Sequence, residues 1–332
     1  MCSKKYGLFF TGTFLTLPFF IKTNTMLLEK KITIIGAGGL GHPALYSLIH
    51  NLTNINQYII EVIDFDFIET SNLNRQFFFT ENDRGKNKAE VLVEKSKKLI
   101  LAEKNIKLTA KNIALNKENI DQILYDSDLI IDATDNITIK FLINDYCVTI
   151  AKPFIYGGAI AETGQVLFYN PKDPNSFCLR CIFEDFTDDD FQNQTATCQQ
   201  AGILGSVTGI IGSYQAKLCK DYFLDPTTRG TFIRFNQSEI KSIKHNRNKN
   251  CSIHGISQKK LDLLDKKCPE TFLYTKLALE TSNDNLLLTA YYSSKDSQEN
   301  VAISCRVEGY NAWRIKTELN YYPLCILKCI QN

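Results

Sequence analysis

The sequence predicts an α/β fold: a doubly wound, mainly parallel sheet of the Rossmann type, with antiparallel additions and a small C-terminal appendage. From residue 31 to residue 158, short apolar segments rich in β-branched residues alternate with segments of helical spacing. A glycine-rich run at 36–41 directly follows the first apolar segment. Strands that alternate with helices form parallel sheets, because each helix crosses back over the sheet.

The strands and helices of the predicted sheet follow one another in regular order. The first apolar segment is β-branched and runs straight into the glycines. Pro43 lies where the first turn of a helix tolerates a proline. Strands are expected at 31–35, 58–64, 107–110, 128–132 and 153–158, and helices at 43–50, 86–101, 119–125 and 138–150.

The second half of the chain adds further elements to this sheet. Residues 166–169 and 231–235 are short apolar segments, and we expect them to be antiparallel strands. Residues 184–194 are polar and acidic, which predicts a mobile loop. Residues 201–218 are apolar and punctuated by glycine, which predicts a buried helix.

Length predicts one large domain with a smaller appendage, because 332 residues are many for a single domain. We expect residues 1–26 to pack on the core as a helix and a turn. Residues 27–255 are expected to form the large α/β domain, and residues 256–332 a short α/β tail.

The composition argues against two classes of partner. The net charge of +2 is nearly neutral, so we expect no extended nucleic-acid surface. No uncharged apolar run reaches about 18 residues, so we expect no membrane span. Eleven cysteines are an odd number without a compact disulfide spacing, which favours a reducing compartment. We therefore expect a cytoplasmic protein.

The N-terminus has an alternative interpretation. Lys4 and Lys5 precede the apolar segment 7–21, which has the shape of a signal peptide. No cleavage pattern of small residues follows this segment. We therefore favour a segment that packs on the domain over a targeting segment.

Four glycines, Gly36, Gly38, Gly39 and Gly41, lie between the first strand and the first helix. Such a loop turns tightly and brings backbone N–H groups to a phosphate at a helix N-terminus. Asp64 ends the second strand, where a carboxylate commonly binds ribose hydroxyls. These features alone fit an NAD-dependent oxidoreductase as well as an ATP-binding enzyme.

Charged residues beyond these features favour ATP. Arg75 follows the second strand and Lys88 begins the next helix. Two cations suit a triphosphate, because they neutralise the β and γ oxygens and stabilise the departing pyrophosphate. Asp135 follows the fourth strand, in a position to hold Mg²⁺ together with water and phosphate oxygens. The other predicted nucleotide contacts are Asp66, Ser71, Asn72, Gln76 and Asn136.

Six motifs together resemble the MoeB/ThiF group of the E1-like superfamily, the adenylyltransferases that activate ubiquitin-like sulfur carriers. The resemblance covers roughly residues 27–255, and it implies that this domain binds ATP. The matching segments are 36–41, 64–76, 85–88, 132–136, the pair Cys178–Cys181, and 197–212.

The resemblance implies an enzyme that uses ATP and Mg²⁺ to adenylate the C-terminal Gly-Gly carboxylate of a small sulfur carrier, with release of pyrophosphate. It also implies a homodimer that acts in thiamine or molybdopterin sulfur transfer. By position, Asp64 would bind the ribose, Gly39 the phosphates and Asp135 the magnesium. Residues 71–75 would line the nucleotide, and Arg75 and Lys88 would stabilise the triphosphate.

Three alternatives remain open from the sequence. They are adenylation of a peptide C-terminus in peptide-antibiotic synthesis, a catalytically weak scaffold that binds nucleotide and carrier, and an NAD-dependent oxidoreductase. Members of the resembled family carry an arginine before the first strand that reaches the partner subunit's ATP. Residues 11–18 occupy that place here without an arginine. Loss of such an arginine is expected to slow turnover.

Two pairs of metal-binding residue types lie far apart in the chain. Cys178 and Cys181 form a CxxC pair, and Cys251 and His254 form a second pair with the same spacing. Four such ligands predict a closed structural zinc site that takes no part in catalysis. The resembled family has CxxC at both places, so His254 replaces a cysteine. The alternative is a set of reduced thiols and a surface histidine.

The remaining cysteines have different expected roles. By resemblance, Cys198 occupies the position of a cysteine that bonds covalently to the carrier or its sulfur in some relatives. The N-terminus of the following helix would lower the pKa of such a thiol. The alternative is an inert buried thiol. Cys147, Cys219 and Cys268 are expected to be packing residues.

The end of the chain weakly resembles the end of a rhodanese-like domain. The expected order over residues 300–328 is a strand, a loop that contains Cys305, a helix and a strand. Glu308 and Tyr310 stand where a glycine and an arginine would be expected. A persulfide needs an anion-binding loop, and Glu308 opposes it. We therefore expect a shortened, inactive relic or a docking element.

Overall fold

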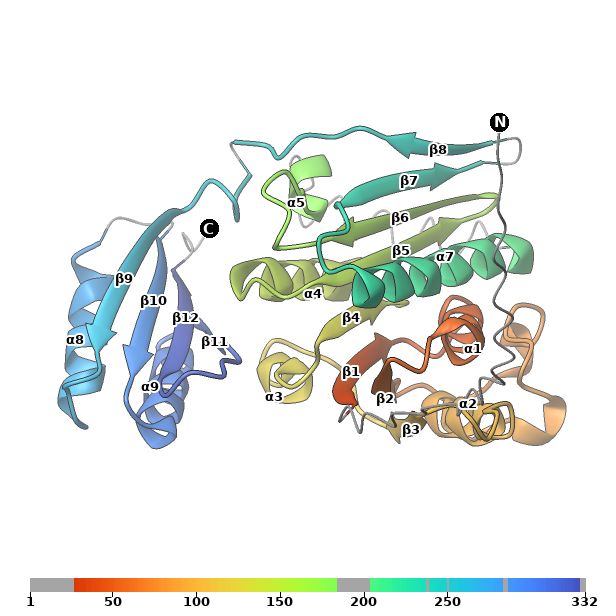
Figure 1. Cartoon of the computed structure of the whole chain (residues 1–332), viewed down its shortest axis with the longest axis horizontal. Coiled ribbons are helices and arrows are strands. Elements are labelled where there is room, and N and C mark those ends of the chain that lie inside the picture. The colour runs from red at the N-terminus through yellow and green to blue at the C-terminus, as the bar shows by residue number, and fades with distance from the viewer. Residues whose placement is uncertain (1–26, 184–203, 237–238, 250, 283–285, 329–332) are drawn as a thin grey trace, which may run out of the picture.

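The structure is a computed structural model, and it describes residues 27–183, 204–236, 239–249, 251–282 and 286–328. These residues form two β-sheets, each with helices packed against it (Figure 1). Predictions for residues 1–26 and 184–194 lie outside the described residues. None of the helices in the described ranges has the length and apolar character needed to span a bilayer.

The larger sheet has eight strands in the order β3-β2-β1-β4-β5-β6-β7-β8. The first five in this order are parallel, and β6, β7 and β8 continue the sheet as antiparallel strands. The predicted fold class, mainly parallel with antiparallel additions, is therefore confirmed. The strands are β1 Leu28–Ile35, β2 Asn56–Ile63, β3 Ile106–Lys111, β4 Leu129–Asp132, β5 Phe154–Ile160, β6 Thr163–Tyr169, β7 Thr231–Phe235 and β8 Ile240–Ile243.

Helices cover both faces of the larger sheet (Figure 1). Apolar side chains of α1, α2 and α7 form one core cluster with the sheet, and those of α3 and α4 form another on the opposite face. The helices are α1 Gly41–Asn51, α2 Lys88–Lys97, α3 Ile120–Leu124, α4 Ile137–Thr149, α5 Leu179–Ile182 and α7 Gly205–Leu224, with short 3₁₀ turns at Thr70–Asn72 and Glu81–Asp83.

Local signals explain where the helices begin and end. The side chain of Asn87 accepts a hydrogen bond from the backbone N–H of Glu90, and this cap starts α2. The predicted helix at 201–218 is α7, which runs on to Leu224. It ends before Pro226, because a proline disfavours helical geometry in the residue before it.

A glycine lets α7 approach α1 closely. A Cβ atom at Gly212 would lie 2.5 Å from the carbonyl oxygen of Leu40 and 2.5 Å from the ring of Pro43. Only a residue without a side chain fits this contact. The contact brings the N-terminal half of α7 beside the glycine-rich loop that precedes α1.

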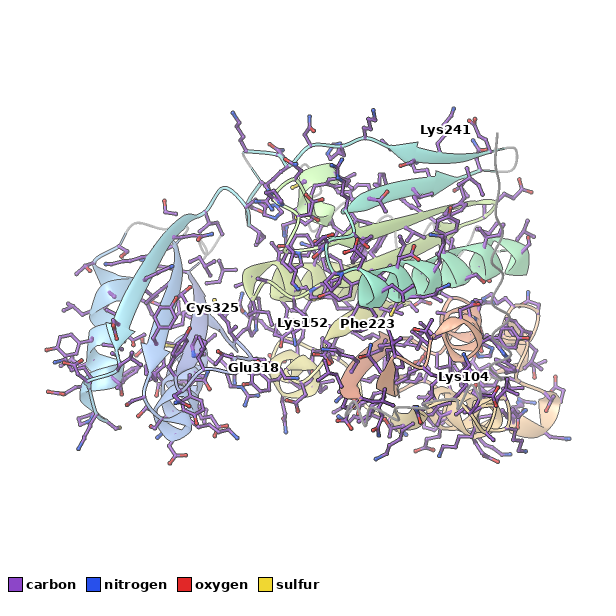
Figure 2. All side chains as sticks on the ribbon, viewed as in Figure 1. Lys104, Lys152, Phe223, Lys241, Glu318 and Cys325 are labelled. Atoms are coloured by element: carbon purple, nitrogen blue, oxygen red, sulfur yellow. The ribbon has the colours of Figure 1, made fainter. Side chains whose placement is uncertain are left out.

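The smaller sheet has four strands in the order β11-β12-β10-β9. Its helices α8 and α9 pack on one face, and the other face turns towards the larger sheet (Figure 1). Cys325, labelled in Figure 2, belongs to this second face. The elements are β9 Ser257–Leu263, α8 Glu270–Glu280, β10 Leu286–Tyr292, α9 Lys295–Val307, β11 Asn311–Arg314 and β12 Tyr322–Lys328.

The order of elements predicted for residues 300–328 is wrong. Cys305 lies in α9 and is buried, so it does not form an exposed loop. The predicted helix after it is the strand β11. Ser294 caps α9, and Val301 and Cys305 then share one buried helical face. Cys268, predicted to be a packing residue, is exposed.

A buried carboxylate joins the smaller sheet to the larger domain. Asp121 in α3 is 2% exposed and accepts hydrogen bonds from Arg306 Nη2 at 2.9 Å and Arg314 Nε at 2.7 Å. The backbone N–H of Arg314 donates to the other carboxylate oxygen at 3.0 Å. Beside these bonds, the rings of Tyr146 and Trp313 meet edge to face at 5.5 Å. Polar and apolar contacts therefore fix this interface together.

The Asp121 interface predicts a large effect on stability. We expect Asp121→Ala to lower the free energy of unfolding by about 3 kcal/mol, because two guanidinium groups lose their shared buried partner. Urea denaturation measures this loss. The control is Glu299→Ala, which removes a half-exposed partner of Arg314 and should cost less than about 1 kcal/mol. Equal losses in both variants would contradict the assignment.

Candidate functional site

The glycine-rich loop lies where the strand order of the larger sheet reverses. β1 has β2 on one side and β4 on the other, and the chain crosses to opposite faces from this point. Ligands of open parallel sheets bind at such a switch point, beyond the carboxyl ends of the strands. The loop from Gly36 to Leu40 follows β1 at that edge.

Two glycines are required by the shape of this loop. Gly36 has φ +100°, and a Cβ atom there would lie 2.5 Å from the carbonyl oxygen of Ala133. A Cβ atom at Gly41 would collide with the carbonyl oxygen of Gly36. Gly38, by contrast, faces open space, with Gln76 Nε2 the nearest atom at 3.8 Å from its would-be Cβ. The loop therefore packs against the end of β4 and leaves its middle accessible.

Asp64 is bound to the loop by its carboxylate. Its Oδ2 accepts a hydrogen bond from the backbone N–H of Ala37 at 2.7 Å, and its Oδ1 accepts one from Asp66 at 2.8 Å. Burial raises the pKa of this carboxyl group, and the two backbone N–H groups act against that rise. Each oxygen retains a further lone pair for a hydroxyl donor. The carboxylate therefore suits the predicted ribose contact.

Lys88 lies at the start of α2 with its ammonium group on Asp66. The Lys88 Nζ is 2.8 Å from Asp66 Oδ2, and the lysine is 8% exposed whereas the Asp66 side chain is half-exposed. The side-chain amide of Asn87 donates to the backbone carbonyls of Asp64 and Asp66 at 3.0 and 3.2 Å. These bonds hold the acid pair and the lysine beside the glycine-rich loop.

Gln76 lies next to the middle of the loop, and Arg75 precedes it in the chain. The guanidinium of half-buried Arg75 donates to Asn72 Oδ1 at 2.8 Å and to the backbone carbonyl of Ser71 at 3.3 Å. Gln76 is 2% exposed, and its Oε1 makes no hydrogen bond within the described part of the chain. The 70–76 segment thus folds back on itself, and its Gln76 amide lies next to Gly38.

Asp135 completes the set, one residue before the cap of α4. Its side chain is exposed and makes no hydrogen bond or ion pair to another described residue. Asn136 caps the helix, since its side chain accepts from the backbone N–H of Ile139 at 3.0 Å. A free carboxylate near a glycine-rich loop of this shape fits Mg²⁺, which is usually held by one or two carboxylates, water and substrate phosphates. Asn136 therefore has a structural role.

The structure adds residues that the sequence did not single out. A Cβ atom at Gly39 would lie 3.2 Å from Thr208 Cγ2, and one at Gly205 would lie 3.7 Å from the Cα of Arg75. The first turns of α7 therefore border both the glycine-rich loop and the arginine. Only the contact of α7 with α1, which comes from the tertiary fold, places them there.

His42 is a second residue that the sequence analysis missed. It is fully buried directly after the loop, and its Nδ1 accepts a hydrogen bond from the backbone N–H of Phe78 at 3.3 Å. The rings of Phe77, Phe78 and Phe79 surround it. Burial lowers the pKa of this imidazole to about 3, so it is neutral near pH 7. It joins the start of α1 to the segment that carries Arg75.

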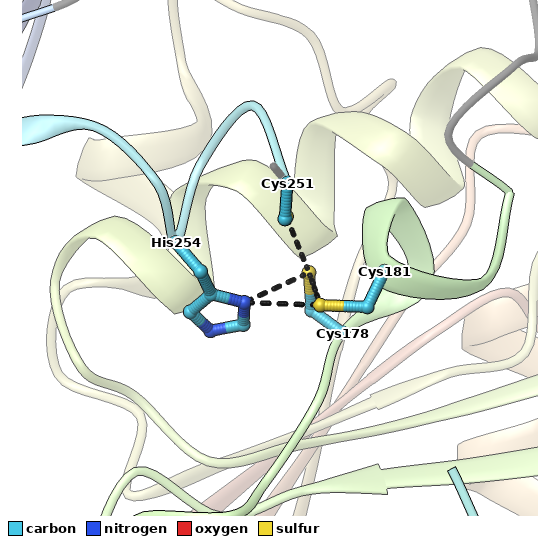
Figure 3. Close-up of side chains that lie close together, drawn as sticks. All are labelled: Cys178, Cys181, Cys251 and His254. Carbon is cyan, nitrogen blue, oxygen red and sulfur yellow. Dashed lines mark hydrogen bonds between the residues drawn. The ribbon is translucent and has the colours of Figure 1, made fainter. Parts of the chain in front are cut away.

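The four predicted zinc ligands lie together (Figure 3). Cys178 and Cys181 come from the start of α5, and Cys251 and His254 from the connection between β8 and β9. Cys178 Sγ is 3.8 Å from the Sγ atoms of both other cysteines, and His254 Nδ1 is 3.7 Å from Cys178 Sγ and 3.2 Å from Cys181 Sγ. The four ligand atoms all lie within 4.8 Å of one another.

These distances fit one tetrahedral zinc ion. Ligand atoms at about 2.3 Å from zinc in a tetrahedron lie about 3.8 Å from one another. Burial raises the pKa of the Cys178 thiol, whereas hydrogen bonds from Cys178 and Cys251 lower the pKa of Cys181. A bound cation would hold all three as thiolates. We refer to these four residues as the clip.

Three further cysteines had predicted roles. Cys147 and Cys219 are buried, as predicted for packing residues, and burial raises the pKa of both thiols. Cys198 lies outside the described residues, as does the 11–18 segment in which the sequence lacks an arginine.

The chain is similar in sequence to a known protein family. The sequence pattern of the ThiF family matches residues 15–253, which is most of the chain. The chain belongs to the ThiF family. The glycine-rich loop, the Asp64–Gln76 segment, Lys88, Asp135 and the clip all lie within the matched residues or directly at their end.

Two curated relatives of this ThiF family chain illustrate the similarity. It is 36% identical over 191 residues to "Adenylyltransferase and sulfurtransferase MOCS3" of Dictyostelium discoideum. This alignment covers 57% of this chain and 42% of the relative. It is 35% identical over 192 residues to "Probable molybdopterin-synthase adenylyltransferase" of Porphyra purpurea. That alignment covers 57% of this chain and 47% of the relative. The match thus spans less than half the length of either relative.

Solved structures of E. coli MccB share the fold. The structure of MccB with ATP superposes with a TM-score of 0.56 at 22% identity, covering 68% of this chain and 67% of that chain. The structure of MccB with SeMet MccA gives a TM-score of 0.55 at 22% identity, with coverage of 68% of this chain and 66% of that chain. At this identity the likeness is one of fold.

The clip predicts one zinc ion per chain. We expect Cys178→Ser to lose this zinc, because the thiolate that contacts all three other ligands is removed. Elemental analysis of the purified protein measures the metal. Cys147→Ala is the matched control, a buried cysteine outside the clip that should leave the zinc in place. Zinc retained in Cys178→Ser, or none in the unmodified protein, would refute the assignment.

His42 predicts a loss of stability in acid. The unfolded chain binds a proton below its usual pKa of about 6.5, whereas folded His42 stays neutral down to a pKa of about 3. Stability from this group is therefore lost as the pH falls from 6.5, by up to about 1.4 kcal/mol per pH unit. We expect His42→Asn to be less sensitive to pH than the unmodified protein between pH 6.5 and 4.5.

Denaturation with urea at several pH values measures this difference. His50→Asn, which changes an exposed histidine in the last turn of the same helix, should retain the pH dependence of the unmodified protein. The clip is common to all three proteins, so its own acid sensitivity cancels in the comparison. Identical pH profiles for His42→Asn and the unmodified protein would show that His42 is not held neutral.

Proposed function

We propose that this protein is an adenylyltransferase that uses ATP and Mg²⁺ to activate the C-terminal Gly-Gly carboxylate of a small ubiquitin-like sulfur carrier. The observation that carries the proposal is that the segments with Lys88, Arg75 and Asp135 all adjoin one glycine-rich loop. The first does so through the bond of Asp64 to Ala37, the second through Gln76 beside Gly38, and the third through Ala133 beside Gly36. Two cations and a free carboxylate suit a triphosphate with its metal. A nicotinamide dinucleotide has only two phosphates to neutralise, so the oxidoreductase alternative is disfavoured.

The proposed reaction requires alignment of the reactants and neutralisation of the phosphates, and it requires no general base. A carboxylate oxygen of the carrier attacks the α-phosphorus of ATP, a new P–O bond forms, and the bond from the α-phosphorus to the bridging β-phosphate oxygen breaks. The electron pair leaves with pyrophosphate. Because the nucleophile is already ionised at neutral pH, no protein group has to remove a proton. Catalysis then depends on alignment and on neutralising the phosphates.

Each residue of the site has a proposed role in this reaction. Asp64 binds the ribose hydroxyls, with Asp66 beside it. The backbone N–H groups around Gly38 and Gly39 bind phosphate oxygens, and Arg75 and Lys88 stabilise the departing pyrophosphate. Asp135 holds Mg²⁺, which when bound offsets phosphate charge. The remaining nucleotide contacts are proposed to be Gly36, Gly41, Ser71, Asn72 and Gln76.

Further proposals concern the surroundings of this reaction. The clip is proposed to hold structural zinc, since four protein ligands leave no place for a reacting water. We propose a homodimer, supported by half-exposed apolar side chains close to the site, namely Tyr46, Phe77 and Ile210. The names of the relatives favour molybdopterin sulfur transfer over thiamine synthesis. From the sequence, we also propose a cytoplasmic location and a covalent role of Cys198.

Exchange of labelled pyrophosphate into ATP tests the proposed reaction. We expect exchange with a recombinant sulfur carrier that ends in Gly-Gly, and none when its last glycine is deleted. Arg75→Ala and Asp135→Ala should each lower the exchange rate at least about 100-fold, because each removes charge stabilisation of the transition state. Arg229→Ala and Asp265→Ala, exposed residues of the same types elsewhere, are the matched controls.

Each alternative predicts a different outcome. Exchange with a short unstructured peptide but not with the carrier supports peptide adenylation. ATP binding without exchange supports a scaffold, and NADH binding in place of ATP supports an oxidoreductase. An Asp135→Ala variant with normal exchange would overturn the magnesium assignment.

A further inference from the structure

Lys140 is a buried cation that the proposed reaction does not yet use. It lies on α4 and is only 6% exposed. Its Nζ lies 3.3 and 3.1 Å from the two carboxylate oxygens of Asp132, and it donates to the backbone carbonyl of Gly157 at 2.6 Å. It also lies 4.8 Å from the centre of the Tyr156 ring. Lys140 thus joins α4 to the end of β4 and to the middle of β5.

Asp132, the ionic partner of Lys140, also binds the loop that follows β4. Its Oδ1 accepts hydrogen bonds from the backbone N–H of Thr134 at 3.0 Å and from the Thr134 hydroxyl at 2.8 Å. Asp132 is 1% exposed, so its carboxylate depends on Lys140 as its ionic partner. A buried carboxylate that loses such a partner is strongly disfavoured. The position of Thr134 therefore depends on the lysine.

Asp135 is the residue held by this arrangement. On one side of it, Thr134 is bound to Asp132, and on the other side Asn136 is fixed as the cap of α4. The carboxylate of Asp135 itself has no partner among the described residues. Its backbone is therefore fixed on both sides while its side chain stays free for a ligand. The same loop packs on Gly36, whose would-be Cβ lies 2.5 Å from Ala133 O.

We propose that Lys140 is a positioning residue for magnesium: through Asp132 and Thr134 it fixes the loop that presents Asp135 next to the glycine-rich loop. This inference rests on the proposed function. It adds to that function a buried ion pair that sets the affinity for the metal without touching metal or nucleotide. The residue belongs to α4, five positions beyond Asp135 along the chain.

The test compares the magnesium requirement of three lysine variants. We expect Lys140→Met to raise the Mg²⁺ concentration for half-maximal pyrophosphate exchange about tenfold and to lower the maximal rate, because small displacements in a site have effects of this size or larger. Lys140→Arg keeps the cation and should restore the requirement to within about threefold of the unmodified protein. The control is Lys152→Met.

Lys152 is a matched control because it is also a buried lysine, at the other end of β4 (labelled in Figure 2). Its Nζ donates to the backbone carbonyls of Leu124, Tyr125 and Ser127 at 2.7 to 2.9 Å. Its loss should lower stability without a change in the magnesium requirement. A rise in that requirement in Lys152→Met equal to that in Lys140→Met would contradict the proposal, because a general loss of stability would then explain both.

A second measurement does not depend on turnover. The increase in melting temperature caused by ATP is measured with and without Mg²⁺, and we expect the magnesium-dependent part to shrink in Lys140→Met. If that variant does not fold, the Thr134→Val variant tests the proposal instead, because it removes only the hydroxyl contact with Asp132. It should raise the magnesium requirement about threefold, a loss of about 0.7 kcal/mol that is typical of one hydrogen bond. An unchanged requirement would contradict the proposal.

The outcomes separate the two proposals. An unmodified protein with neither carrier-dependent exchange nor magnesium-dependent stabilisation by ATP would refute the proposed function. An unmodified protein with both, together with a Lys140→Met variant of unchanged magnesium requirement, would refute only the role of Lys140.

Discussion

The contact between Gly36 and the backbone of Ala133 is the constraint on which the rest of the site depends. It fixes the end of β1 against the end of β4, so the glycine-rich loop and the loop with Asp135 form one surface. Asp64 then attaches β2 to this surface through the Ala37 N–H. A methyl group at position 36 would separate these elements, which explains why a residue without a side chain stands there.

The clip and the Asp121 interface hold the chain together where its two sheets meet. The clip ties the start of α5 to the connection between β8 and β9, at the place where the chain leaves the larger sheet. Asp121 binds two arginines of the C-terminal part at a separate point, Arg306 of α9 and Arg314 of β11. The clip is a cluster of three thiols and an imidazole, whereas the Asp121 interface is made of buried charges, so the two attachments differ in chemistry.

Much of this arrangement could be predicted from local sequence signals. The glycine-rich run, the alternation of apolar segments and the spacing of the clip residues each depend on a few neighbouring positions. The helix around Cys305 was missed, because its apolar residues resemble a strand unless the cap at Ser294 is recognised. Two ion pairs, Lys88 with Asp66 and Lys140 with Asp132, arise from the tertiary fold. No local sequence pattern predicts them.

The histidine in the clip has an electrostatic consequence for the proposed zinc site. A zinc ion bound there by three thiolates and one neutral imidazole would give the site one unit of negative charge, whereas four thiolates would give two units. The adjoining connection is rich in basic side chains, among them Lys244, Arg247 and Lys249, which would offset this smaller charge. With one sulfur fewer, the clip also offers oxidants one target fewer, so this attachment of the smaller sheet is less exposed to thiol oxidation.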